Sequence, residues 1–328
     1  MKIENDYINK INVLALILIS IYCISNVGHT IDSSHKLIYN LTRLVTNLGF
    51  PLLLMTFGAA MLKKHENPLG FVKETYKSIL PSFIIWNVIL GILILYFDGS
   101  NSFIPKLFKT NWFLWVILSN VLVVPILSEF IRFENGDGIK YILALFFISS
   151  ILLSLSIQFN FRLYYIDLVF FAEPLAFMVL GYYLANKEFK FNSTRIFLIS
   201  SIILVITLFL RVLLVTSATT SWTAFFINIY GTTFHISVDP FTIIEVSSIF
   251  LMLKSLKGFL NNNSIINFYS NKTFSFILVL GIFTYLLPKF ALKLSWIKLT
   301  FVSTILFLIF AGILFFILEK IPFIKRYY

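Results

Sequence analysis

The chain has 328 residues, of which 59% are hydrophobic and only 12% carry a charge. A soluble globular domain is about 25% charged and at most about half apolar, so this composition excludes an ordinary soluble fold. The net charge of +11 does not indicate a nucleic-acid partner, because the basic residues lie in short clusters between apolar runs and not in one stripe. The single cysteine, Cys23, excludes an intramolecular disulfide.

Apolar runs follow one another along the whole chain, and most approach the roughly 20 residues that a transmembrane helix needs. The sequence therefore predicts an all-α fold, a polytopic integral membrane helical bundle with about ten transmembrane helices in a single membrane domain over residues 1–328. No small-residue cleavage site follows the first run, so we expect a retained helix and not a signal peptide. The predicted spans are Ile11–Ser25, Asn47–Leu62, Ile79–Tyr96, Trp112–Ile131, Tyr141–Ile157, Leu163–Leu184, Ile196–Val215, Phe241–Leu253, Phe274–Leu292 and Leu299–Leu318.

The basic residues between the spans predict the orientation. With the N-terminus in the cytoplasm, about two thirds of the 26 Lys and Arg residues fall in cytoplasmic segments, as the positive-inside rule requires. We therefore expect both termini in the cytoplasm and an even number of spans. The longest outer connection, Thr216–Pro240, has no Lys or Arg and is rich in aromatic residues. Such a segment is expected to lie at the membrane interface or to re-enter the membrane.

A charged side chain inside a span is costly, so it indicates either a structural ion pair or a functional site. Arg211 and Glu245 both fall in the outer halves of their spans, and we predict that they pair. The pair serves either as a structural contact or as a binding site for an anionic or sugar substrate. Glu173, which precedes Pro174, and His235 are further candidate substrate-binding residues. The remaining ionisable residues within spans, both near span ends, are Glu129 and Asp167.

Histidine is the usual general base of a membrane enzyme, because its ordinary pKa lies near neutrality. His29 follows the first span most closely and is the candidate catalytic base, whereas His65 is expected in a cytoplasmic loop. Asp32 and Asp239 are candidate orienting carboxylates for the outer histidines, which also include His35. The chain has no HExxH, CxxC, glycine-rich phosphate loop or GxSxG motif, so no metal site and no tightly bound cofactor is predicted.

Five short motifs follow one another along the chain in an order that is typical of a known family. "NLGFPLLLMTFGAAMLKK" (Asn47–Lys64) has a Pro before an apolar run that ends in Gly, Leu and basic residues. "FVKETYKSILPSFIIW" (Phe71–Trp86) is a basic lead into a Pro-marked span, and "NWFLWVILSNVLVVPIL" (Asn111–Leu127) has a Trp-Phe-Leu start. "FMVLGYYLANK" (Phe177–Lys187) and the basic ending "ILEKIPFIKRYY" complete the series. In this order the motifs resemble the acyltransferase-3 family of polytopic membrane proteins.

The resemblance implies an O-acetyltransferase type of enzyme in the bacterial cytoplasmic (inner) membrane. Such proteins transfer an acyl group, commonly acetyl, from an acyl-coenzyme A to a sugar hydroxyl in polysaccharide biosynthesis. The implied acceptor is a surface polysaccharide (O-antigen, capsule or exopolysaccharide) or its lipid-linked sugar precursor. The implied partners are this acceptor and the lipid bilayer, with acetyl-coenzyme A or another acyl-coenzyme A as the donor and no nucleic acid.

The chain departs from the family pattern in the first span. Asn12 stands where the family has an Arg, and Cys23 stands where the family has a His. An amide cannot hold an anion as a guanidinium does, and a thiol in an apolar helix is a poor base. The chain is therefore either an acyltransferase with divergent residues or a relative without catalysis.

Two hypotheses from different functional classes fit a helical frame of this kind without acyl transfer. The first is a component that transports or exports a polysaccharide or a lipid-linked sugar. The second is a glycan polymerase, which usually has one large outer loop with Arg-rich patches. The Thr216–Pro240 segment has no Lys or Arg, and this argues against a polymerase.

Overall fold

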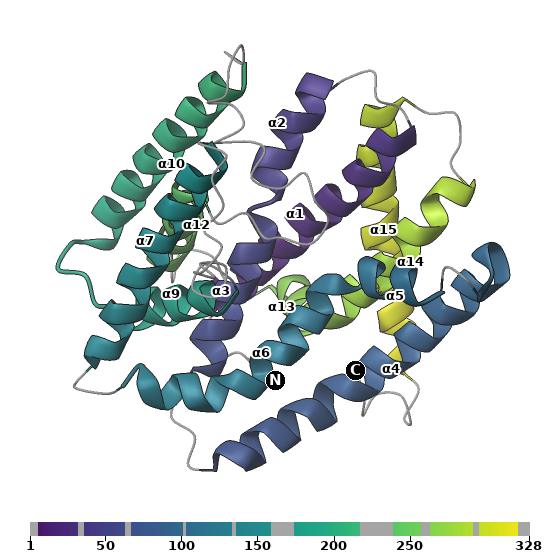
Figure 1. The fold of residues 1–328 in the computed structure, drawn as a ribbon, viewed down its shortest axis with the longest axis horizontal. Coiled ribbons are helices and arrows are strands. Elements are labelled where there is room, and N and C mark those ends of the chain that lie inside the picture. The colour runs from purple at the N-terminus through teal and green to yellow at the C-terminus, as the bar shows by residue number, and fades with distance from the viewer. Residues whose placement is uncertain are drawn as a thin grey trace.

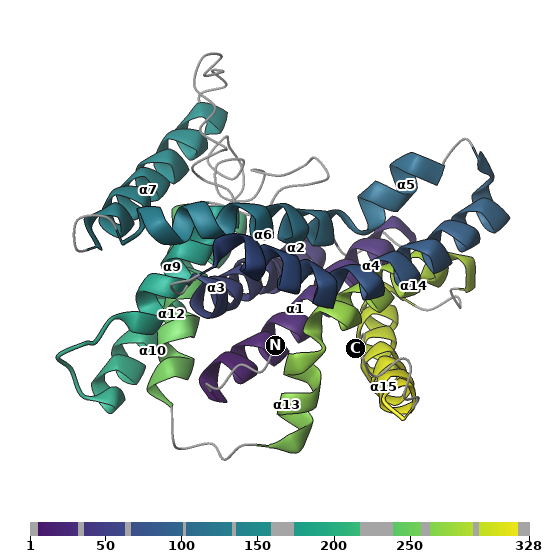
Figure 2. The same ribbon diagram turned by 90° about the horizontal axis from the view of Figure 1, so that it is seen from below.

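The computed structural model describes residues 6–31, 36–62, 67–100, 103–132, 136–158, 174–216, 239–256, 263–290 and 295–320. Within these ranges every regular element is a helix, which confirms the predicted all-α fold class. Figures 1 and 2 show the helices crossing one another at varied angles around α1 and α3. The helices are α1 (Asp6–Ile31), α2 (Lys36–Thr46), α3 (Gly49–Met61), α4 (Pro68–Asp98), α5 (Phe103–Thr110), α6 (Trp112–Phe130), α7 (Asp137–Gln158), α9 (Pro174–Asn186), α10 (Ser193–Thr216), α12 (Pro240–Ser255), α13 (Ser264–Asn271), α14 (Thr273–Phe290) and α15 (Trp296–Leu318).

Seven stretches of described helix are long and apolar enough to cross a membrane, as expected of a membrane protein. They are Asp6–Thr30, Leu37–Met61, Leu69–Asp98, Trp112–Phe130, Ser193–Leu213, Thr273–Phe290 and Trp296–Leu318. Each overlaps a predicted span. The predicted spans Tyr141–Ile157 and Phe241–Leu253 lie on α7 and on the 16-residue α12. Of the predicted span Leu163–Leu184, the structure describes only the residues from Pro174 onward, which belong to α9.

α10 has a polar buried face and an apolar exposed face, the reverse of a helix on a soluble protein. Ser200, Thr207 and Arg211 are buried, and their spacing of seven and four residues places them on one face. The opposite face exposes large apolar side chains such as Val205 and Phe209, which are 65% and 61% exposed. A helix in water would turn the apolar face inward, so this polarity suits contact with lipid.

α1 is a central helix of the described fold and packs against α3, α12, α13, α14 and α15. Its side chains Ile11, Ala15 and Ile19 are fully buried. α15 runs antiparallel to it, because Trp296 at the start of α15 donates its indole N–H to the carbonyl of Ser25 near the end of α1, at 3.0 Å. The start of α1 and the end of α15 therefore lie at the same end of this helix pair.

The backbones of α3 and α9 lie so close together that a Cβ atom would not fit at two of their glycines. A Cβ atom at Gly58 of α3 would overlap the backbone of Met178, and a Cβ atom at Gly181 of α9 would overlap the backbone of Met55. Small residues at such positions let two apolar helices pack backbone to backbone, as is common in membranes. The two glycines therefore explain why these helices form a tight pair.

α4 begins well before the predicted span at Ile79. Asn67 caps its first turn by accepting a hydrogen bond from the backbone N–H of Gly70 at 2.8 Å, and Pro68 occupies the first helical position. Lys73 and Lys77, in the segment expected to lead into the span, lie exposed on the first turns of this helix. The cytoplasmic lead expected from the sequence is thus helical.

Candidate functional site

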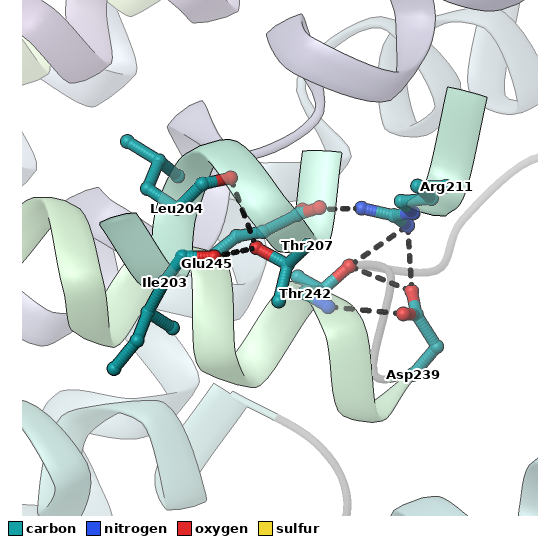
Figure 3. Close-up of polar contacts among 7 residues, drawn as sticks. All are labelled: Ile203, Leu204, Thr207, Arg211, Asp239, Thr242 and Glu245. Carbon is teal, nitrogen blue, oxygen red and sulfur yellow. Dashed lines mark hydrogen bonds and ion pairs between the residues drawn. The ribbon is translucent and has the colours of Figure 1, made fainter. Parts of the chain in front are cut away.

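The described part of the chain holds a fully buried ionic cluster between α10 and α12 (Figure 3). Arg211 donates from Nη1 to Glu245 Oε2 at 2.5 Å, and from Nη2 to Asp239 Oδ2 at 2.8 Å and to Thr242 Oγ1 at 3.0 Å. The three charged residues are 3%, 0% and 1% exposed, in the order Arg211, Glu245 and Asp239. Ion pairs this deep lose their hydration, so they persist only where charges and hydrogen bonds compensate one another.

The sequence around Asp239 explains how the cluster forms. Asp239 is the N-cap of α12, and Pro240 follows it at the first helical position. Its Oδ1 accepts from the backbone N–H of Thr242 at 2.9 Å, and its Oδ2 accepts from the Thr242 hydroxyl at 2.6 Å. Glu245 lies about one and two-thirds turns further along α12, and both carboxylates contact the same guanidinium. Thr207, one turn before Arg211 on α10, bonds back to the carbonyl of Ile203 (Figure 3).

The cluster is not balanced in charge. It contains two carboxyl groups and one guanidinium, so it carries a net charge of −1 when both acids are ionised. Glu245 Oε1 and Arg211 Nε are buried and have no hydrogen-bond partner among the described residues. An unpartnered buried atom of this kind is costly and commonly marks a position where a ligand, an ion or a proton completes the contact.

The predicted pairing of Arg211 with Glu245 is confirmed. Asp239, which the sequence suggested as an orienting group for a histidine, is a second partner of Arg211, and that contact was not predicted. The signal for it was the Asp-Pro pair at the start of an apolar run, which indicates a helix N-cap. The candidate substrate-binding residues His235 and Glu173 lie outside the described residues, so their roles stay predictions.

His29, the candidate base, lies in the last turn of α1 and stacks on Tyr39 of α2. The ring centroids are 3.8 Å apart and the planes differ by 14°. The Tyr39 hydroxyl donates to Asn26 Oδ1 at 2.6 Å, and the Tyr39 ring meets Trp296 edge to face at 6.0 Å. His29 Nδ1 is buried and has no partner among the described residues, although the ring as a whole is only half-buried.

A cation lies close to this aromatic group. Arg43 follows Tyr39 by one turn of α2, and its guanidinium interacts with the Tyr39 hydroxyl. The same guanidinium lies 6.0 Å from the centroid of the Tyr22 ring on α1. A histidine with an unpartnered nitrogen and a nearby guanidinium could bind a hydroxyl group and an anionic oxygen together. The candidate catalytic site at the end of α1 is therefore His29, Tyr39, Asn26 and Arg43.

The position where the resemblance expects an arginine lies in an uncharged network. Asn12 Nδ2 donates to Ser270 Oγ at 3.1 Å, and its Oδ1 accepts from Thr56 Oγ1 at 2.5 Å. Ser270 Oγ donates to Asn9 Oδ1 at 2.9 Å, and Asn9 Nδ2 donates to Asn267 Oδ1 at 2.8 Å. These side chains join α1, α3 and α13 and use one another as partners. Asn12 is thus a structural link between helices, and both polar atoms of its amide have a partner in this network.

The other predicted residues within the described ranges are not part of either site. Glu129 is exposed and lies 3.6 Å from Arg132, a pair at the end of α6. Cys23 is a free, half-buried thiol on α1. Among the described residues no group of three His, Cys, Asp or Glu side chains could hold a metal ion. A small cavity of about 10 Å³ lies between α3, α6 and α9, where Asn120 and Phe57 line it, and it is large enough for about one water molecule.

No protein-family model, no curated protein and no solved structure matches this chain.

Proposed function

We propose that the chain is a membrane-bound acyltransferase of the acyltransferase-3 type, which modifies a bacterial surface polysaccharide. In this proposal it crosses the cytoplasmic membrane about ten times, with both termini in the cytoplasm. The antiparallel pairing of α1 with α15 supports an even number of crossings, because it brings the start of α1 and the end of α15 to one side. The tight contact of α3 with α9 lends further support, because these helices carry two of the motifs behind the resemblance.

The observation that carries the proposal is His29 Nδ1, a buried imidazole nitrogen without a partner in the described structure. Such a nitrogen can take the proton from a sugar hydroxyl while the hydroxyl oxygen forms a bond to the acyl carbonyl carbon. Because His29 lies at the outer end of α1 in this orientation, the acyl end of the donor has to extend through the bundle from the cytoplasmic side. The carbon–sulfur bond of its thioester breaks, and the coenzyme A thiolate leaves with the electron pair and takes up a proton. Stacking on Tyr39 fixes the plane of the imidazole, so its nitrogen is already oriented for this step.

Arg43 replaces the missing arginine of the first span in this proposal. Its guanidinium lies beside the Tyr39 hydroxyl and is therefore close to the His29 ring that stacks on the same tyrosine. A cation at this position stabilises the negative charge that develops on the carbonyl oxygen as the hydroxyl attacks. Arg211 is less suited to this role, because both of its Nη atoms already donate to Asp239 and Glu245.

The test is acylation of the surface polysaccharide in a deletion strain complemented with single variants. We expect His29→Ala to lower acylation by about 10²–10⁴-fold, which is the usual contribution of a general base. Thr30→Ala is the matched control, because Thr30 is the next residue and its hydroxyl bonds to the carbonyl of Val27 in its own helix. Loss of acylation with His35→Ala and not with His29→Ala would refute the assignment of the base. Unchanged acylation on deletion of the wild-type chain would refute the acyltransferase itself.

The second candidate function is that of a component that transports or exports a polysaccharide or a lipid-linked sugar, without acyl transfer. The specific observation in its favour is the buried cluster of Arg211, Asp239 and Glu245, because intramembrane charges commonly line substrate or ion pathways. The two functions predict different polysaccharides in the deletion strain. A transport component leaves the polymer absent from the cell surface, whereas an acyltransferase leaves it present without its acyl groups.

A further inference from the structure

The two acids of the α10–α12 cluster differ in the number of hydrogen bonds that they accept. Asp239 accepts three hydrogen bonds, from the backbone and hydroxyl of Thr242 and from Arg211. Glu245 accepts one, from Arg211, and its second oxygen is buried without a partner among the described residues. Hydrogen bonds to a carboxylate favour its ionised form, whereas burial without them favours the neutral acid. Of the two acids, Glu245 is therefore the one that can remain neutral.

We propose that Glu245 is a proton-binding site whose occupancy sets the net charge of the contact between α10 and α12. With the proton bound, the cluster is one guanidinium and one carboxylate and carries no net charge. Without the proton it carries a net charge of −1 among buried apolar groups, which is costly.

Among the described residues no other counter-ion of Glu245 is found on the helices around α12. The charged side chains of the cluster itself are Arg211 and Asp239. α12 packs against α1, α3, α7, α9 and α10, and α3 has no titratable residue. Tyr7 of α1 contacts Phe250, about 7.5 Å further along α12. The other titratable residues of these helices, none with a described contact to Glu245, are Asp6, Lys10, Tyr22, Cys23, His29, Asp137, Lys140, Tyr141, Tyr182, Tyr183 and Arg195.

A metal cation fits the site less well than a proton. Alkali and alkaline-earth ions take several oxygen ligands, about six or more for Ca²⁺. The cluster offers Glu245 Oε1 as its one carboxylate oxygen without a hydrogen-bond partner, and the guanidinium of Arg211 lies against the other oxygen. A proton needs only this one atom. The proposal does not depend on acyl transfer, because His29 and Arg43 lie on α1 and α2.

The test is infrared difference spectroscopy of the purified full chain in lipid nanodiscs, between a pH near neutrality and one about two units higher. An exposed glutamate is fully ionised at both pH values, since its ordinary pKa is about 4.3. We expect the wild-type chain to show the loss of a protonated carboxyl band as the pH rises. Glu245→Gln should abolish this band, and the matched control Glu188→Gln, which removes an exposed carboxylate after α9, should leave it unchanged.

Glutamine has nearly the shape of the protonated acid and can still accept from Arg211, so Glu245→Gln should fold. Its melting temperature near neutral pH should stay within a few degrees of the wild-type value. A wild-type spectrum without a carboxyl band, or a band that persists in Glu245→Gln, would refute the proposal. A band that responds to sodium at constant pH would also refute it, because the site would then bind a metal cation.

Discussion

Two of the buried polar regions that join helices in the described part of the chain differ in the charge of their members. The network around Asn12 links α1, α3 and α13 with uncharged amides and hydroxyls. The cluster around Arg211 links α10 and α12 with one cation and two acids. In the first network no buried side-chain nitrogen or oxygen lacks a partner, whereas in the second a guanidinium nitrogen and a carboxylate oxygen have no partner among the described residues.

The difference concerns what each region can do besides holding helices together. An uncharged network in which every buried polar atom has a partner gains little from a ligand, so it is best understood as a structural link. A charged cluster with unpartnered buried atoms can change its charge by binding a proton or a substrate group. The comparison therefore distinguishes two kinds of buried polar group. The uncharged side chains around Asn12 stabilise the packing of the helices, whereas the charged side chains around Arg211 can also bind a proton or a ligand.

The largest effect is expected from Arg211→Met. This change leaves Asp239 and Glu245 buried without their cation, and breaking one side of a buried ion pair commonly costs about 3–5 kcal/mol. We expect a large fall in melting temperature and in the yield of the purified chain. Arg195→Met is the matched control, because Arg195 is exposed at the other end of α10. If both variants were equally stable, the cluster would not be a structural element of the fold.

A smaller effect is expected from Asn12→Ala. The change removes two hydrogen bonds, but the groups left behind keep other partners. The Thr56 hydroxyl can donate instead to the carbonyl of Leu53, which lies 2.7 Å from Oγ1, and Ser270 Oγ still donates to Asn9. We therefore expect a loss of about 1–2 kcal/mol, measured as a shift in thermal unfolding.

The control for this change is Asn186→Ala, which removes an exposed asparagine whose amide bonds to its own helix. A loss with Asn12→Ala as large as that with Arg211→Met would contradict the distinction between the two regions. A loss no larger than that with Asn186→Ala would mean that the network around Asn12 contributes no stability.

The sequence predicted the all-α class and the Arg211–Glu245 pair for physical reasons. Apolar runs of membrane-spanning length are helices, and two opposite charges in such runs are expected to find each other. It did not predict Asp239 as a third member, because periodicity locates the faces of a helix and not the contacts of its cap. The start of α4 at Pro68 was missed in the same way, although Asn67 and Pro68 together are an N-cap signal.

The helix α2 and two shorter helices, α5 and α13, were also absent from the prediction. α5 and α13 have eight residues each, too few to show a clear period, and α13 supplies Ser270 and Asn267 to the network around Asn12. These contacts join residues more than 250 positions apart in the chain. Hydrophobic patterns say nothing about such distant contacts, so the partners of Asn12 could be found only from the arrangement of the helices.

The smallest effect on stability is expected at an ion pair that is exposed to solvent. Asp137 and Lys140 form an ion pair at 2.6 Å in the first turn of α7, and their side chains are 61% and 77% exposed. The Asp137 carboxylate raises the pKa of Lys140 above its ordinary value. Solvent screens an exposed pair, so Asp137→Asn should leave the melting temperature at neutral pH almost unchanged.

The dependence on pH follows from the direction of that shift. A lysine whose pKa is raised in the folded chain contributes its stability fully below its ordinary pKa of about 10.4, and loses it as the pH rises through the raised value. The melting curves of wild type and Asp137→Asn should therefore differ slightly at neutral pH in low salt and coincide in strong alkali. Added salt should remove the small difference at neutral pH. If Asp137→Asn cost as much as Arg211→Met, burial would not be what distinguishes the α10–α12 cluster from an exposed ion pair.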